Sequence, residues 1–223
     1  MIFRASIPEI REGLVQPFQV REIARFGTIR VYAYRSLGEI ARHRHLEFDE
    51  VFLVYEGLVT FWTDREEITL KPDELIRIPA GLAHRSGSRL PSLVLLFRRD
   101  LSPGRWNGSF RTHAPAGARP EIARIHEALR AHPPFTRVHL LTASGVRYYG
   151  LQGNGPSPTW TTRGPMFLLL LRGEVEMMAE GLGLPEPARG ILGPGELAVL
   201  PEGVHWRWQS QEPSTLLLAE GPP

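Results

Sequence analysis

The 223-residue chain contains no cysteine. A disulfide framework, a thiolate metal site and a cysteine nucleophile are therefore excluded together, and any metal ion must be held by histidine and carboxylate side chains. Lysine and asparagine are scarce: the 26 basic residues include one lysine, Lys71, and the only asparagines are Asn107 and Asn154. Arginine in place of lysine, with few thermolabile residues, suggests a thermophilic or GC-rich source.

Long apolar runs are also missing. The longest, Met166–Leu171, is far shorter than the roughly 20 residues that cross a bilayer, and charges interrupt the N-terminus too often for a signal peptide. The net charge of +2 gives little reason to expect a nucleic-acid or membrane partner. We therefore expect a cytoplasmic protein that binds neither nucleic acid nor membrane.

Glycine and proline, by contrast, are numerous, with 22 and 20 residues. They separate short runs rich in aliphatic, β-branched and aromatic residues: Thr28–Tyr34, Val51–Tyr55, Val59–Trp62, Leu75–Ile78, Leu93–Phe97, Val138–Leu141, Val146–Leu151, Phe167–Leu171, Leu197–Leu200 and Thr215–Leu218. Many short runs divided by turn formers predict an all-β protein, either a sandwich or a barrel.

One segment departs from this pattern. In Pro120–Ala131 the residues Ile122, Ile125 and Leu129 recur at helical spacing, with a proline in the first turn and two prolines beyond the end. A stretch of glycine, proline and alanine precedes it. We predict a short helix here, in a linker between two β domains.

The sequence also repeats itself, which supports two domains. Residues 73–84 resemble residues 195–205, with Pro79 and Gly81 matched by Pro201 and Gly203. Each copy follows an apolar run that ends in glycine and precedes an aliphatic run, which indicates a duplication. We expect an N-terminal domain over residues 1–110, a linker over 111–136 and a C-terminal domain over 137–223.

The residues with the clearest chemistry lie in the first copy. His43 and His45 would project from the same face of a strand, and a turn over residues 46–49 would bring Glu50 back toward them. His84 follows the turn at Pro79. Taken singly, each of these residues is more often a surface or core residue than a ligand, so only the joint pattern predicts a metal site.

The same stretch resembles the cupin superfamily. The first cupin motif is His-x-His, three or four residues, Glu, six residues and Gly, which His43, His45, Glu50 and Gly57 match. The second motif is Gly, five residues, Pro-x-Gly, two residues, His, three residues and Asn. Here Pro79, Gly81 and His84 match, while Asp73 replaces the glycine and Ser88 the asparagine.

The resemblance implies two tandem double-stranded β-helix barrels of the jelly-roll type, that is, a bicupin. It further implies that His43, His45, Glu50 and His84 bind one divalent transition metal in the first barrel. Such a set favours Mn, Fe, Co, Ni, Cu or Zn over Mg and Ca, which prefer oxygen ligands. On a six-coordinate ion, four protein ligands leave two positions for substrate and dioxygen or water.

The second half gives a different result. With Gly173 as the anchor, the template places Met166 at the glutamate position and Thr159 and Thr161 at the first two histidine positions, while His205 stands one residue early. A methionine thioether is a poor ligand for hard divalent ions. We expect the second barrel to lack the metal site.

Three functions stay open at this point. The first is a metalloenzyme acting on a small organic substrate, dioxygenase-like or isomerase-like; the second is a non-catalytic binding or sensing protein; the third is a structural bicupin. Strand parity from Glu50 and Pro79 suggests Phe52, Val54 and Arg77 as substrate-binding residues. Exposed strand edges make a homodimer plausible.

Overall fold

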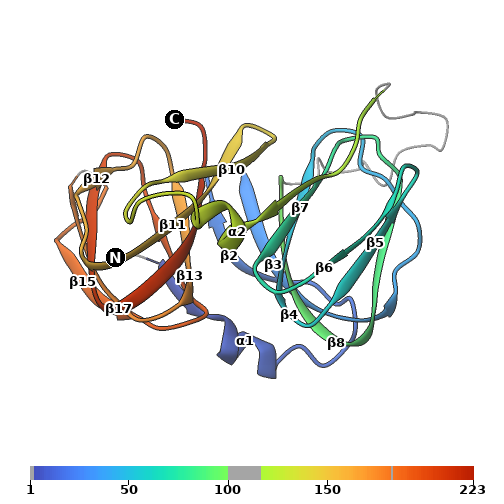
Figure 1. Ribbon diagram of the computed structural model, residues 1–223, viewed down its shortest axis with the longest axis horizontal. Helices are drawn as coiled ribbons and strands as arrows, with labels where there is room; N and C mark the ends of the chain where they lie inside the picture. Colours follow the sequence, from blue (N-terminus) through green and yellow to red (C-terminus); the bar gives the residue numbers. More distant parts are fainter. Residues whose placement is uncertain (1–2, 100–116, 182) are drawn as a thin grey trace. The chain divides into compact units, whose positions relative to one another are not determined.

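The computed structural model describes residues 3–99, 117–181 and 183–223 and is almost entirely β-structure (Figure 1). All ten predicted strand segments lie within or largely within observed strands, so the all-β prediction is confirmed. The chain divides into two compact units. The first-barrel unit comprises Arg11–Ile23 and Ile29–Arg124, and the second-barrel unit comprises Met1–Ile10, Ala24–Thr28 and Ile125–Pro223. The predicted boundary between residues 110 and 111 falls outside the described residues.

An eight-stranded sheet forms the first barrel, with strand order β2-β3-β8-β4-β7-β9 and with β5 and β6 attached through β8. Its strands are β2 (Arg21–Phe26), β3 (Ile29–Glu39), β4 (Glu50–Glu56), β5 (Val59–Thr63), β6 (Glu67–Leu70), β7 (Glu74–Ile78), β8 (His84–Arg99) and β9 (Glu121–Arg124). The long strand β8 closes the barrel, because its first residues pair with β5 and its later residues with β3 and β4.

The interior of this barrel is apolar at one end. Tyr34, Phe52, Phe61, Ile76 and Leu96 belong to one buried cluster contributed by five strands. Alternate residues of each strand face inward and bury their side chains there, as the period-two pattern requires. Glu50, two residues before Phe52 at the start of β4, belongs to the candidate site.

The predicted helix over Pro120–Ala131 is only partly correct. Residues Ile125–Leu129 form the short helix α2, but Glu121–Arg124 form strand β9, which pairs with β7. Helical spacing of Ile122, Ile125 and Leu129 was the sequence signal. Residues Glu121–Arg124 form a strand instead, because the edge of β7 offers backbone hydrogen bonds to this four-residue segment. Ile125 and Leu129 of the remaining helix are buried.

A nine-stranded sheet forms the second barrel, with order β1-β16-β13-β17-β11-β10 and with β12, β14 and β15 attached. Its strands are β1 (Phe3–Ser6), β10 (Val138–Ala143), β11 (Val146–Pro156), β12 (Trp160–Thr161), β13 (Met166–Arg172), β14 (Val175–Gly181), β15 (Ala188–Leu192), β16 (Glu196–Leu200) and β17 (Val204–Glu220). Strand β17 is the equivalent of β8 in this barrel. It pairs with β12 and β14 near its start and with β11 and β13 near its end.

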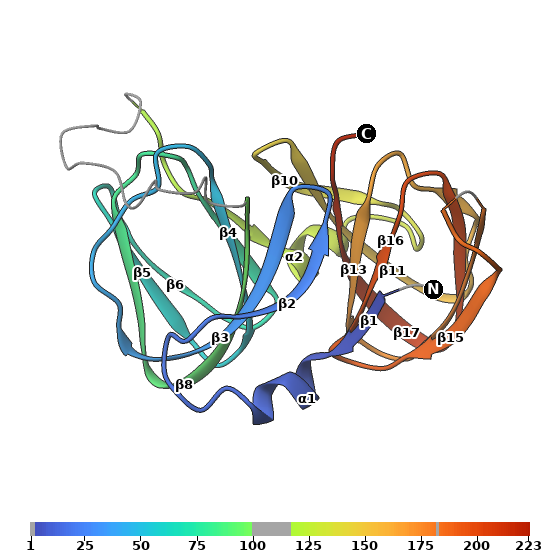
Figure 2. The same cartoon turned by 180° about the vertical axis from the view of Figure 1, so that it is seen from behind.

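The N-terminal segment belongs to the second-barrel unit, although it comes first in the chain. Strand β1 pairs with β16, from Phe3 opposite Val199 to Ser6 opposite Glu196 (Figure 2). A short helix, α1 (Ile7–Glu12), follows and buries Ile7 and Ile10. Neither helix in the described part of the chain is long and apolar enough to cross a membrane.

Candidate metal centre

The backbone brings the three predicted histidines to one place. His43 and His84 form an isolated antiparallel bridge, in which each amide donates to the other residue's carbonyl at 2.9 Å. The amide of Gly81 donates to the carbonyl of His45 at 2.6 Å. Gly81 has φ of 81°, a left-handed conformation that glycine adopts without steric cost. The turn before β8 is thereby fastened to the His43–His45 segment.

Glu50 begins β4 and points into this group. Its Oε1 lies 3.3 Å from Nε2 of His45, and its Oε2 lies 3.2 Å from Nε2 of His84. Ligand atoms of His43, Glu50 and His84 all lie within 4.8 Å of one another. Metal–ligand bonds of about 2.0–2.2 Å place two donors up to about 4.4 Å apart, so small adjustments would suffice for an ion among these atoms.

Backbone carbonyls fix which ring nitrogen carries the proton in two of the histidines. Nδ1 of His43 lies 2.9 Å from the carbonyl oxygen of Ala41, and Nδ1 of His84 lies 3.1 Å from that of Leu82. A carbonyl oxygen only accepts, so Nδ1 must donate in each pair. The Nε2 lone pair of each neutral ring is then free to bind a metal, which is the tautomer that second-shell carbonyls impose on metal-binding histidines.

Burial keeps the imidazoles of His43 and His45 neutral. It lowers the pKa of His45 to about 4, against a smaller opposing effect of Glu50. Burial, with the neighbouring His84, also lowers the pKa of His43. Burial alone would raise the pKa of the Glu50 carboxyl, but the contact with His84 and the nearby His45 and His43 outweigh it and hold that pKa below its usual value. At neutral pH the buried Glu50 carboxylate is therefore ionised, and the rings of His43 and His45 are neutral.

This arrangement fits a bound cation. Glu50 is 2% exposed and His84 is 1% exposed. Although Oε2 of Glu50 and Nε2 of His84 are 3.2 Å apart, neither atom has a hydrogen bond of acceptable geometry. Buried polar atoms without a hydrogen bond are costly unless a partner such as a positive charge satisfies them. A divalent ion would satisfy both atoms.

The lowered pKa values predict acid sensitivity of the metal-free protein. Unfolded His45 takes up a proton near pH 6.5, whereas folded His45 does so only near pH 4. Between these values the unfolded state binds more protons, so stability is full above pH 6.5 and falls as the pH drops toward 4, by about 3 kcal/mol for this residue. Glu50 acts in the same direction, since its folded pKa is also lowered.

Urea denaturation of metal-free protein at pH 7 and pH 4.5 measures this effect. The comparison with His45→Gln isolates the histidine, because the other acid-sensitive groups are common to both proteins. We expect the variant to lose less stability on acidification than the wild type. Equal losses in the two proteins would contradict the assignment of His45 to a buried neutral state.

A cavity of about 320 Å³ opens onto the cluster. It is lined by Phe18, Val20, Tyr34, Ile40, Ala41, Arg42, His43, His45, Glu50, Phe52, Ser86, Leu96 and Arg98. Of the residues predicted to bind substrate, Phe52 therefore lies at the cavity. Val54 shares its face of β4 but is fully buried in the apolar cluster and does not line the cavity.

Arg77 is not at the site, and parity from Pro79 pointed the wrong way. Arg77 pairs with Val51 and so faces the side of the sheet opposite to Glu50, which pairs with Ile78. Its Nε donates to Asp49 Oδ2 at 3.0 Å and its Nη1 to Glu121 at 3.1 Å. Since Asp49 also accepts from the amide of Ala80 at 2.9 Å, Arg77 helps to hold the turn before β8.

Two polar residues of the cavity had no sequence signal. The buried Tyr34 hydroxyl hydrogen-bonds Ser86, and burial raises its pKa, with a further contribution from the charge of Glu50. Arg98, near the end of β8, lies on the same face as Leu96. Tyr34 ends one predicted strand and Arg98 directly follows another, but only the pairing of β3, β4 and β8 brings them to the cluster.

The second barrel has a different set of residues at the same positions. Trp160 pairs with Trp206 as His43 pairs with His84, and Met166 pairs with Leu200 as Glu50 pairs with Ile78. The amide of Gly203 donates to Thr162 as that of Gly81 donates to His45. Trp160, Thr162, Met166 and Trp206 thus correspond to the four candidate ligands.

This register corrects the sequence alignment by one residue at three positions. Trp160, Thr162 and Trp206 replace Thr159, Thr161 and His205 as the counterparts of the histidines. The Met166 assignment agrees with the structure. Trp206 is 1% exposed and packs in the core with Met166, so bulky apolar side chains fill the space that the imidazoles and the cavity occupy in the first barrel.

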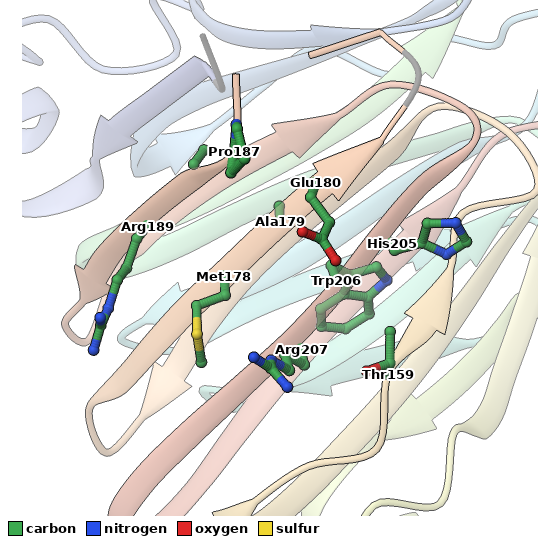
Figure 3. A pocket seen from close by; sticks show the side chains of 10 residues that line it. Thr159, Met178, Ala179, Glu180, Pro187, Arg189, His205, Trp206 and Arg207 are labelled. Carbon is green, nitrogen blue, oxygen red and sulfur yellow. The ribbon is translucent and has the colours of Figure 1, made fainter. Parts of the chain in front are cut away.

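His205 faces the outside of the second barrel. It pairs with Glu180 across β17 and β14, and both side chains border a hollow of about 270 Å³ with Arg207 and Arg189 (Figure 3). Nδ1 of His205 lies 2.8 Å from Oγ1 of Thr161. In the described residues, the only group of three or more metal-ligand side chains close enough to share an ion is His43, Glu50 and His84.

Comparisons with known proteins agree with this geometry. Residues 34–91 match the family model described as "Cupin domain". A 73-residue segment is 37% identical to quercetin 2,3-dioxygenase of Bacillus subtilis, and covers 33% of this chain but only 21% of that protein. The chain thus spans about a fifth of that curated relative.

Two solved structures resemble the chain over nearly its whole length. A cupin 2 conserved barrel domain protein from Leptotrichia buccalis has a TM-score of 0.70 at 14% identity, covering 98% of this chain and 96% of that one. The Streptomyces albus protein HEPD, solved with 2-hydroxyethylphosphonate and Fe(II) bound, has a TM-score of 0.70 at 11% identity, covering 99% and 76%. Residues 34–91 of the first barrel thus match a cupin domain, and the chain has the fold of two tandem cupin barrels.

Proposed function

We propose that the chain is a metal-dependent enzyme of the dioxygenase-like cupin type, with its active site in the first barrel. The observation behind this proposal is the buried Glu50 carboxylate, whose two oxygens lie 3.3 Å and 3.2 Å from the Nε2 atoms of His45 and His84. His43, His45, Glu50 and His84 would hold one divalent transition metal. When bound, the metal supplies a Lewis acid and, for iron, manganese or copper, a redox centre.

The chain's own residues prepare the site in three ways. Glu50 provides the negative charge that favours a divalent ion, and the backbone acceptors of His43 and His84 place the proton of each neutral ring on Nδ1. Phe52 and Leu96 give the cavity apolar walls that keep bulk water from the reacting groups.

Two observations support catalysis over a purely structural metal. The cavity of about 320 Å³ reaches His43, His45 and Glu50, whereas a structural ion is normally enclosed by its ligands. The similarity to a quercetin dioxygenase falls on a segment of 73 residues, and the neighbour HEPD binds Fe(II). These similarities support an oxygen-dependent reaction, and iron as the first metal to test.

Metal analysis and oxygen consumption test the proposal together. We expect protein made in metal-supplemented medium to carry close to one transition metal ion per chain. Loaded with Fe(II) or Mn(II), it should consume oxygen with at least one member of a panel of catechols, flavonols and β-diketones. Absence of bound metal would refute the proposal. Bound metal and tight ligand binding without any turnover would instead favour the binding or sensing protein.

A further inference from the structure

Arg98 lies on the cavity face of the first barrel beside the candidate metal centre. On β8, Leu96 pairs with Phe52 of β4 and with Tyr32 of β3. Residues two apart on a strand share a face, so Arg98 follows Leu96 on the side of the sheet that bears Phe52 and Glu50. Its guanidinium carbon lies 4.8 Å above the ring of Tyr32, and this contact orients the side chain.

The charge of Arg98 is not neutralised within the described part of the chain. Two arginines line the cavity, and one of them, Arg42, forms an ion pair with Asp64. No carboxylate of the described residues forms an ion pair with Arg98.

The rest of the cavity is suited to an apolar body. Phe18, Val20, Ile40, Phe52 and Leu96 supply aromatic and aliphatic walls. Glu50 is the only acidic residue of the lining, and it is surrounded by imidazoles. A volume of about 320 Å³ is near the lower limit for cavities that hold small molecules, so the occupant is small.

We propose that Arg98 binds the anionic group of the substrate, and that the substrate class is a small organic carboxylate with an apolar or aromatic body. The inference rests on the proposed function in taking this cavity as the substrate site. A single planar guanidinium matches a carboxylate through two parallel hydrogen bonds. One such group suits a singly charged anion better than a polyphosphate, which normally requires several cations.

The test uses benzoate and benzamide as probes, because they share a shape and differ in charge. Isothermal titration gives their dissociation constants for the full-length wild type, Arg98→Gln, Arg98→Lys and the control Arg99→Gln. Arg99 neighbours Arg98 on β8 but is exposed and points to the other face, so its replacement changes the net charge equally. Each protein is titrated with and without added Zn(II), and its metal content is measured in parallel.

We expect benzoate to bind the wild type more tightly than benzamide and to lose roughly tenfold or more in Arg98→Gln. Arg98→Lys should lose less, and Arg99→Gln should match the wild type. Benzamide affinity should not change. Equal benzoate affinity in wild type and Arg98→Gln, or no preference of the wild type for benzoate, would overturn the inference. Arg98-dependent benzoate binding by a wild type that takes up no metal would uphold it and refute the proposed metalloenzyme.

Discussion

Replacing Glu50 by methionine is expected to abolish metal binding and, in the metal-free protein, to raise the free energy of unfolding. The second barrel already has this residue at the corresponding position, Met166, where it packs in a buried apolar core. In the first barrel the change removes a carboxylate that is 2% exposed and has an oxygen without a hydrogen bond. Replacing a buried ion pair by apolar residues of similar volume is often neutral or stabilises by about 1–4 kcal/mol, and here the rings of His43 and His45 that remain carry no charge.

The opposite signs of the two effects make the experiment specific. Metal affinity is measured by competition with a chromogenic chelator. It should fall by more than the 10–100-fold loss that is typical when a residue hydrogen-bonded to a metal ligand is replaced. Urea denaturation of the metal-free proteins measures stability. Glu39→Gln removes an exposed carboxylate of β3 and should change neither quantity appreciably. A Glu50→Met protein that binds metal like the wild type would exclude Glu50 as a ligand.

Replacing Trp206 by alanine is expected to have the largest effect on stability, a loss of about 3–5 kcal/mol. Trp206 is 1% exposed and contacts a core that includes Met166, Leu168 and Trp208. Its ring fills the position that His84 occupies in the first barrel, so alanine leaves a cavity in the middle of the second. Urea denaturation followed by circular dichroism measures the loss.

Two further variants test whether the loss of stability comes from the cavity that Trp206→Ala leaves in the core. Trp62→Ala removes a partly exposed tryptophan of β5 that packs against Arg85, and we expect it to cost much less. Trp206→Phe deletes an indole N–H that has no hydrogen-bond partner in the described residues and keeps most of the ring, so it should cost little. If Trp206→Ala were no worse than Trp62→Ala, the second barrel would not depend on this packing.

Much of the fold could be predicted because its strands are short apolar runs between glycines and prolines. Strands such as β6 and β15 gave no such signal, since polar residues and glycine, for example Glu67, Arg189 and Gly190, break up the apolar run. The segment from Glu121 to Arg124 was predicted as helix because its spacing is helical. Its conformation depends on an edge of β7 that is distant in sequence, which no local pattern reveals.

The four candidate ligands could be named from the sequence because their spacing is fixed by one strand pair and one turn. The residues around them could not. Arg77 lies on a predicted strand and Arg98 directly follows one, yet Arg77 binds Asp49 on the far side of the sheet and Arg98 lines the cavity. Counting alternate residues from a turn does not reliably predict which face of the sheet a side chain is on, because the alternation is interrupted at the turn. The face on which Arg98 lies follows instead from the register of β8 with β3 and β4.

Strand β1 has a consequence for how the chain folds during synthesis. Ser6 pairs with Glu196, and a ribosome adding about 5–20 residues per second delivers the second residue about 10–40 s after the first. The whole first-barrel unit is synthesised during that interval, while strand β1 still lacks its neighbour β16. Nascent protein should therefore expose β1 as an unpaired segment, and completion of the second barrel should be among the last steps of folding.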